Sequence, residues 1–271
     1  QQFAMLGIAF FLPFHMTFVY PFFLMVIMCE IFNRDFFLRQ VTMFSSPLVL
    51  SFMFFFFINL IGLTWTSNMI DGTENVKRYV PFLLFGFLWL AAKYENQDKY
   101  IISFISGVTF CSVLAHYNLL QQNYPDFLAE GIISGKRNGE ETSPFLSHLN
   151  YAPIIAIAIY FVTFAVFKTT SNIKEFSLRL SILLLLLSNL LFSTGRAGFL
   201  MLIVLISALI FQTSRNIRIS FIKFLIIIPL SFTAAYNFSD SVRDRVDDGL
   251  NDIQNFSNNP NTSVGLRMVF A

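Results

Sequence analysis

Long apolar runs without charge are the feature that most constrains the fold of this chain. Residues 180–195, for example, contain no Lys, Arg, Asp or Glu. A helix in water needs a polar face, so runs of this kind require lipid as their solvent. Only 13% of the chain is charged, whereas a soluble globular chain carries about a quarter. These observations predict an all-α fold, a polytopic bundle of transmembrane helices.

Nine apolar runs have the length of a membrane-spanning helix, or approach it, since a span needs about 17 to 20 residues. The runs are residues 3–12, 14–32, 44–63, 79–92, 100–118, 151–167, 176–193, 197–211 and 220–236. We expect about nine spans in a single membrane domain over residues 1–271. Residues 268–271 look like the start of a continuing segment, so the chain is expected to be a C-terminally truncated fragment.

The Lys and Arg residues predict how these spans are oriented. Ten of the 18 lie in or beside the connections 33–40, 93–99, 168–178 and 212–223, with only four of the 16 Asp and Glu. Basic residues resist translocation, so these connections and the N-terminus are expected to be cytoplasmic. The external segments would then be 64–78, 119–150 and 237–271. We expect function on these segments, because functional residues gather on loops held by a rigid scaffold.

The turn Ser193-Thr194-Gly195-Arg196-Ala197-Gly198 lies between two apolar runs on the expected external face. Glycines let the backbone bend and approach closely, and Ser193 or Thr194 could cap the next helix. Arg196 beside the positive end of that helix would hold an anion. In the alternative interpretation, Arg196 reaches to the lipid headgroups and only marks the membrane boundary.

The segment 119–150 carries a second set of candidates. Lys136 and Arg137 follow Gly135 and could pair with phosphate. His148 lies just before the next apolar run, where an imidazole could transfer a proton at neutral pH. Alternatively, the basic pair is only a solvated turn beside Glu140 and Glu141, and His148 bonds locally.

The segment after Asn237 predicts an external amphipathic helix that begins at Asp240. Its apolar residues recur near the helical period, and charged residues such as Arg243 and Arg245 lie between them. The apolar positions are Val242, Val246, Leu250 and Ile253.

Several classes of site have no sequence support. The chain carries no Gly-rich phosphate loop and no His or Cys pair at metal-ligand spacing, so we expect neither a cofactor nor a metal. Cys29 and Cys111 both lie in apolar runs and predict no disulfide. A net charge of +2 gives no reason to expect a nucleic-acid partner.

Taken in order, these motifs resemble a known family. The sequence passes from His148-Leu149-Asn150-Tyr151-Ala152 to the Arg196 turn, then to Val242-Arg243-Asp244-Arg245 and Ser263-Val264-Gly265-Leu266-Arg267. This arrangement is similar to that of the O-antigen ligase and O-antigen polymerase superfamily of bacterial inner-membrane glycosyltransferases. The resemblance covers about residues 134–271, and Gly195 stands where the family usually has Ser.

The resemblance implies a metal-independent, inverting-type transfer on the periplasmic face, in lipopolysaccharide or other surface-polysaccharide biosynthesis. The donor would be a glycan on undecaprenyl diphosphate, and the acceptor would be lipid A–core or a growing glycan. Arg196 and Arg267 match the family's arginine positions. Lys136, Arg137, Arg243 and Arg245 would add diphosphate contacts. The family's catalytic histidine normally lies beyond the equivalent of Ala271, so His148 is a substitute candidate.

Two other classes of function compete with this one. A transporter would place polar or ionisable groups near the middle of its spans, which here are almost free of them. Glu30 is the one acidic residue near a span interior, and we assign no role to His15 or His116. A non-catalytic assembly partner would explain the 36 Phe residues through its interfaces.

Overall fold

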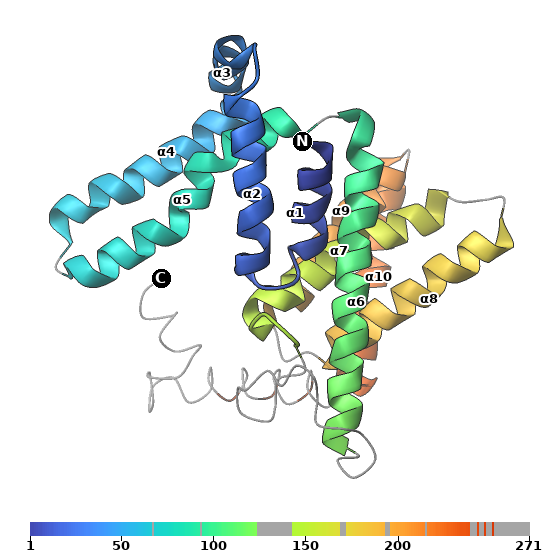
Figure 1. Cartoon of the computed structure of the whole chain (residues 1–271). Helices are drawn as coiled ribbons and strands as arrows, with labels where there is room; N and C mark the ends of the chain where they lie inside the picture. The colour runs from blue at the N-terminus through green and yellow to red at the C-terminus, as the bar shows by residue number, and fades with distance from the viewer. Residues whose placement is uncertain are drawn as a thin grey trace. The chain divides into compact units, whose positions relative to one another are not determined.

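The computed structural model of the chain is built of α-helices (Figure 1). It describes residues 1–66, 68–92, 94–123, 143–168, 172–192, 196–214, 216–238, 243, 247 and 251, and no strand occurs among them. The chain divides into two compact units, residues 1–104 and residues 105–271. We describe each unit by itself.

The first unit is built mainly from antiparallel helix pairs. α1 pairs with α2, and α4 pairs with α5. Pro47 opens α4, where its missing N–H costs nothing, and the side chain of Asn68 accepts hydrogen bonds from the first backbone N–H groups of α5. The elements are α1 (Gln2–Phe11), α2 (Met16–Ile31), α3 (Phe36–Phe44), α4 (Pro47–Gly62), η1 (Leu63–Trp65), α5 (Met69–Ala91) and η2 (Tyr94–Asn96).

Phenylalanines account for much of the packing in these pairs. The ring of Phe11 stacks on that of Phe22 with centroids 5.5 Å apart, which joins α1 to α2. Phe52 meets Phe85 at 4.4 Å between α4 and α5. Offset and tilted ring pairs of this kind add to the burial of apolar area, so part of the high Phe content is helix-packing bulk.

An ion pair holds the sharp bend between α2 and α3. The two helices meet at 113°. The fully buried carboxylate of Glu30 accepts from Arg39 Nε at 2.9 Å and from Arg39 NH2 at 2.7 Å, and the same NH2 donates to Leu90 O at 2.8 Å. The amide of Gln1 also donates to this carboxylate. These bonds give the buried carboxylate the hydrogen-bond partners and the opposite charge that a buried charged group requires in an apolar environment.

The second unit is centred on α7. This helix packs against both α8 and α9, and α9 packs against α10. α6 begins within the first unit and continues in the second. The elements are α6 (Gln97–Asn123), α7 (His148–Lys168), α8 (Ile173–Phe192), α9 (Arg196–Thr213) and α10 (Ile217–Phe238).

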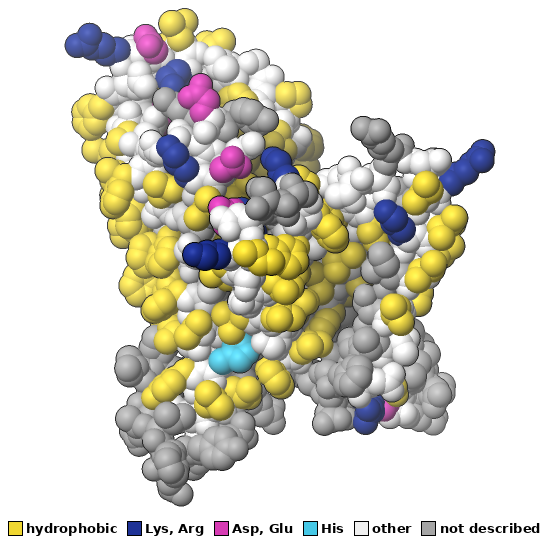
Figure 2. Space-filling view, turned by 90° about the vertical axis from the view of Figure 1, so that its right-hand side faces the viewer, with side chains coloured by type: hydrophobic (Ala, Val, Ile, Leu, Met, Phe, Trp, Pro, Cys, Tyr) yellow, Lys and Arg dark blue, Asp and Glu magenta, His cyan; other side chains and the backbone are white. Residues whose placement is uncertain are grey.

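Four of the described helices are long and apolar enough to cross a membrane, or five if the bent pair α2–α3 counts as one span. They include α4, of whose apolar window only 11% is buried within the structure. Hydrophobic side chains also cover much of the face shown in Figure 2. Because water would not tolerate so much apolar surface, the chain is a membrane protein of the all-helical class.

Each of the nine apolar runs expected from the sequence overlaps a helix, so the helical prediction is confirmed. The structure differs from the prediction in two places. The expected connection 33–40 contains the start of a tenth helix, α3, and residues 69–78 of the expected loop 64–78 belong to α5. α5 begins after its cap, Asn68, ten residues before the apolar run that starts at Tyr79. A prediction based on apolarity alone therefore placed the start of this helix too far along the chain.

Candidate functional site

The start of α9 lies directly against the start of α7. A Cβ atom on Gly198 would stand 2.6 Å from Ala152 Cβ and 2.8 Å from the Ala152 carbonyl carbon. No side chain larger than hydrogen fits there without a shift of the backbone. The close approach expected of Gly198 is therefore confirmed, and its partner is the end of the His148–Ala152 motif.

A second contact shows that α7 and α9 run in the same direction. Tyr160 OH donates to Gln212 Oε1 at 2.7 Å, further along both helices than the Gly198–Ala152 contact. The N-terminal ends of α7 and α9, at His148 and Arg196, therefore lie at the same end of the second unit. Each end presents N–H groups without intrahelical partners and the positive end of a helix dipole.

Beneath these helix ends, a polar cluster joins α6, α7 and α8. We define it by five residues: Ser112, His116, Tyr151, Ser188 and Asn189. Asn189 Nδ2 donates to Ser112 Oγ at 2.8 Å and to Tyr151 OH at 3.0 Å. All three of these side chains are buried. Because unsatisfied polar groups are costly in an apolar interior, these hydrogen bonds tie the three helices to one register.

The histidine of the cluster is also fully engaged. His116 Nδ1 lies 2.8 Å from the backbone oxygen of Ser112, and Nε2 lies 2.9 Å from Ser188 Oγ. The ring meets the edge of Phe192 with centroids 6.2 Å apart. The sequence alone assigns no role to His116, and the structure adds that both of its ring nitrogens have specific partners.

Ser143 adds a buried polar group close to the start of α7. It is 6% exposed, and its hydroxyl has no hydrogen-bond partner in the part of the chain that the structure describes. It belongs to the segment that the sequence singled out around His148. A free hydroxyl of this kind can donate to or accept from a ligand.

The structure describes some of the predicted site residues in full, some by their backbone alone and some not at all. Lys136, Arg137, Arg245 and Arg267 lie outside the described residues, and Arg196 and His148 are described by their backbone alone. Arg243 is described, and it interacts within the chain. Its NH2 donates to Asn237 O at 3.2 Å, and its guanidinium lies 5.8 Å from the centroid of the Tyr236 ring.

The residues of the polar cluster could have been noticed in the sequence as polar positions within long apolar runs. Ser112 and His116 lie four residues apart and therefore on one face of α6, and Ser188-Asn189 interrupt a leucine-rich run. The structure thus corrects the expectation that the spans are almost free of polar groups.

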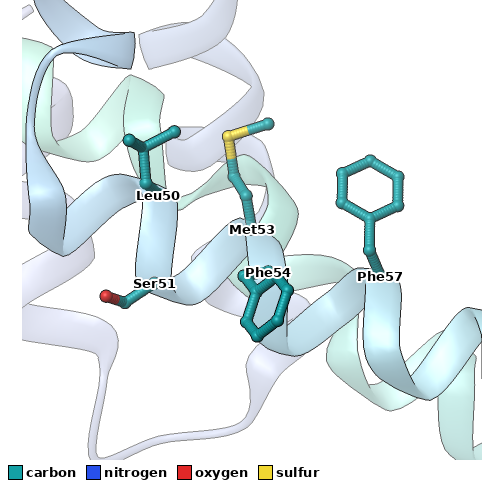
Figure 3. Close-up of a pocket in the computed structure, with 5 residues that line it drawn as sticks. All are labelled: Leu50, Ser51, Met53, Phe54 and Phe57. Carbon is teal, nitrogen blue, oxygen red and sulfur yellow. The ribbon is translucent and has the colours of Figure 1, made fainter.

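A shallow depression on α4 is lined by apolar side chains and one serine whose hydroxyl is already hydrogen-bonded. Figure 3 shows its lining residues, which all come from this one helix: Leu50, Ser51, Met53, Phe54 and Phe57. The Ser51 hydroxyl is engaged with Pro47 O at 2.8 Å. We assign this depression to the lipid-facing surface.

No group of three His, Cys, Asp or Glu residues in the described part of the chain could hold a metal ion.

Comparisons with known proteins identify no relative of this chain: no family model, curated protein or solved structure matches it.

Proposed function

We propose that this chain is a lipid-linked glycan transferase of the O-antigen ligase or polymerase type. It would move a glycan from undecaprenyl diphosphate to an acceptor sugar on the periplasmic face of a bacterial inner membrane. The observation that carries the proposal is the packing of the Arg196 helix start against the His148–Ala152 motif, through Gly198 and Ala152. Two motifs on which the family resemblance depends are thereby adjacent in space.

The chemistry of this end of the unit suits a diphosphate. Two helix N-termini and an arginine are all attractive to an anion. In the proposed reaction, an acceptor hydroxyl oxygen bonds to the anomeric carbon while the bond from that carbon to the diphosphate oxygen breaks. Arg196 would offset the charge that grows on the leaving diphosphate, and His148 is our candidate within this sequence for accepting the hydroxyl proton.

The proposal includes a finer topology than four or five spans. All nine apolar runs would cross the membrane, the N-terminus would be cytoplasmic, and the residues from Asp240 would form an external amphipathic helix. The excess of Lys and Arg in the connections 33–40, 93–99, 168–178 and 212–223 supports this orientation. Lys136, Arg137, Arg243, Arg245 and Arg267 would then be on the donor's side of the membrane.

The test is an Arg196→Ala variant of the whole protein, in a strain that lacks the native copy. We expect normal membrane insertion and a loss of surface polysaccharide. Arg218→Ala, at the start of α10 on the proposed cytoplasmic side, is the matched control and should leave polysaccharide unchanged. Normal polysaccharide in the Arg196→Ala strain would reject the proposal.

One observation favours a second candidate, a polytopic transporter. The polar cluster of α6, α7 and α8 lies within helices long enough to span the membrane, where polar groups often mark a solute or ion pathway. Uptake or export of a solute by the purified protein in liposomes would support this candidate, and the loss of that flux in Asn189→Leu would assign it to the cluster.

A further inference from the structure

We propose that α3 is an interfacial helix. It lies in the plane of the membrane, with Phe37, Leu38, Val41 and Phe44 immersed at the boundary between the lipid headgroups and the acyl chains. The proposal concerns the first unit alone. It depends neither on glycan transfer nor on which side of the membrane α3 occupies.

The exposed face of α3 is apolar. Phe37, Leu38, Val41 and Phe44 follow the spacing i, i+1, i+4 and i+7, which places them on one stripe of the helix. Phe37 is 83% exposed, Leu38 71%, Val41 69% and Phe44 47%. The packing of the first unit therefore leaves this stripe uncovered.

The opposite face of α3 carries the polar contacts. Arg39 points inward, where it donates to the Glu30 carboxylate and to Leu90 O. One turn further, Met43 is 5% exposed and packs on α5, where a Cβ atom on Gly86 would stand 2.9 Å from Met43 Cγ. The pattern of α3 is thus the reverse of that of a helix on a water-exposed surface, whose charged residues face outward. The outer face of α3 is suited to lipid.

The hydroxyl groups beside the stripe are hydrogen-bonded to nearby backbone. Thr42 Oγ1 donates to Leu38 O at 3.1 Å, and Ser45 Oγ donates to Thr42 O at 2.8 Å. Each hydroxyl proton is therefore directed to the protein's own backbone. This arrangement suits an environment in which water does not supply the partner.

The bend after α2 directs α3 across the preceding helix. α2 has 16 residues and a length of about 24 Å, most of the hydrocarbon thickness of about 30 Å. The two helices meet at 113°, so α3 runs close to perpendicular to α2 at its end (Figure 1). If α2 crosses the membrane, α3 lies along the membrane surface.

Charged residues indicate the depth of α3. Arg34 and Asp35 directly precede it, and both are exposed. Charged groups and the open backbone groups at helix ends are costly in hydrocarbon, so the ends of α3 need the headgroup layer. Arg34 is suited to pair with a lipid phosphate there. The headgroup boundary offers both polar partners to the helix ends and acyl chains to the stripe.

The size of the stripe favours lipid over a second copy of the chain. α3 has nine residues and is about 14 Å long. A stable protein interface buries about 800 Å² on each partner, which four side chains of so short a helix do not supply.

The test is spin labelling of the whole chain in vesicles of phosphatidylcholine and phosphatidylglycerol, with Cys29 and Cys111 replaced. Nitroxides are attached singly at Phe37→Cys, Val41→Cys and Phe44→Cys, all exposed positions on the stripe. Collision with oxygen and with a water-soluble nickel chelate gives the depth of each label. We expect all three labels to favour oxygen and to lie at the same depth, about 5–10 Å into the boundary. If one variant fails to fold, the other two still give depths to compare.

Two positions outside α3 calibrate the measurement. Phe54→Cys, on the exposed face of α4, is the reference for acyl chains, and Thr66→Cys is the reference for water. A depth that changes by about 10 Å from Phe37→Cys to Phe44→Cys would overturn the proposal, because α3 would then continue the span. Chelate access equal to that of Thr66→Cys would overturn it in favour of water. Spin–spin broadening at Val41→Cys that disappears on dilution with unlabelled chain would overturn it in favour of a second copy.

Discussion

The hydroxyl of Tyr151 accepts a hydrogen bond from Asn189 Nδ2 at 3.0 Å, and both side chains are buried. Tyr151 belongs to the motif at the start of α7, and Asn189 lies one turn before the end of α8, which leads into the Arg196 turn. Together with the Gly198–Ala152 contact, this bond joins the two motifs at one end of the second unit.

This hydrogen bond should have a measurable coupling energy. We expect the double-mutant cycle of Tyr151→Phe and Asn189→Leu to give about 0.6 kcal/mol, and at most about 1.7 kcal/mol, as for other hydrogen bonds between membrane helices. The measurement is unfolding in mixed micelles of increasing SDS content, followed by circular dichroism. Tyr160→Phe with Gln212→Leu is the control cycle, because that bond is exposed and should give a value near zero. Equal coupling in both cycles would contradict a buried role for Asn189.

Gly198 should not tolerate a methyl group. We expect Gly198→Ala to lower the free energy of unfolding by about 1–3 kcal/mol, because the added Cβ would overlap the backbone of Ala152. Gly62→Ala provides the contrast, since a Cβ at that helical position meets nothing within 4 Å. There, the better helix propensity of Ala should raise stability by up to about 1 kcal/mol. The same micelle titration measures both, and a neutral Gly198→Ala would show that α7 and α9 can separate freely.

The Glu30–Arg39 pair should show the asymmetry of a buried ion pair. Arg39→Gln leaves the carboxylate of Glu30 without its charged partner, and we expect a loss of about 3–5 kcal/mol in the free energy of unfolding. The double variant Glu30→Gln with Arg39→Gln should recover much of that loss.

An exposed pair is the control for this experiment. Glu175 and Arg179 lie four residues apart on α8 at 3.5 Å, and breaking that pair with Glu175→Gln should cost about 0.5 kcal/mol or less. The change is made at Glu175 because Arg179 also donates to Ala165 O at 2.8 Å. If Arg39→Gln is as mild as Glu175→Gln, the bend between α2 and α3 does not depend on its ion pair.

The proposed orientation predicts which positions can be reached from outside the cell. In a variant without Cys29 and Cys111, we expect a membrane-impermeant thiol reagent to label Thr66→Cys in intact cells. Asn172→Cys and Asn216→Cys lie within the connections 168–178 and 212–223, which are rich in Lys and Arg, and should react only after the membrane is opened. Labelling of all three positions, or of the last two alone, would reject this orientation.

The sequence by itself determined that lipid surrounds this protein and that its apolar runs are helices. Runs such as 180–195 leave no water-facing stripe, so lipid and helix follow from composition and length together. The sequence also marked Gly198 for a close approach, because glycine has no side chain to keep two backbones apart. It could not place the start of α5, since that boundary depends on the Asn68 cap and not on apolarity.

Tertiary structure alone decided what the polar residues inside the helices do. Ser112 and His116 are far from Ser188 and Asn189 in sequence, and a pattern on one helix cannot reveal which face meets another. Packing brought them within hydrogen-bond distance, because each buried polar group in an apolar interior must find a partner. The same packing gave Gly198 its partner, Ala152, and placed the Ser188 hydroxyl of α8 beside the His116 ring of α6.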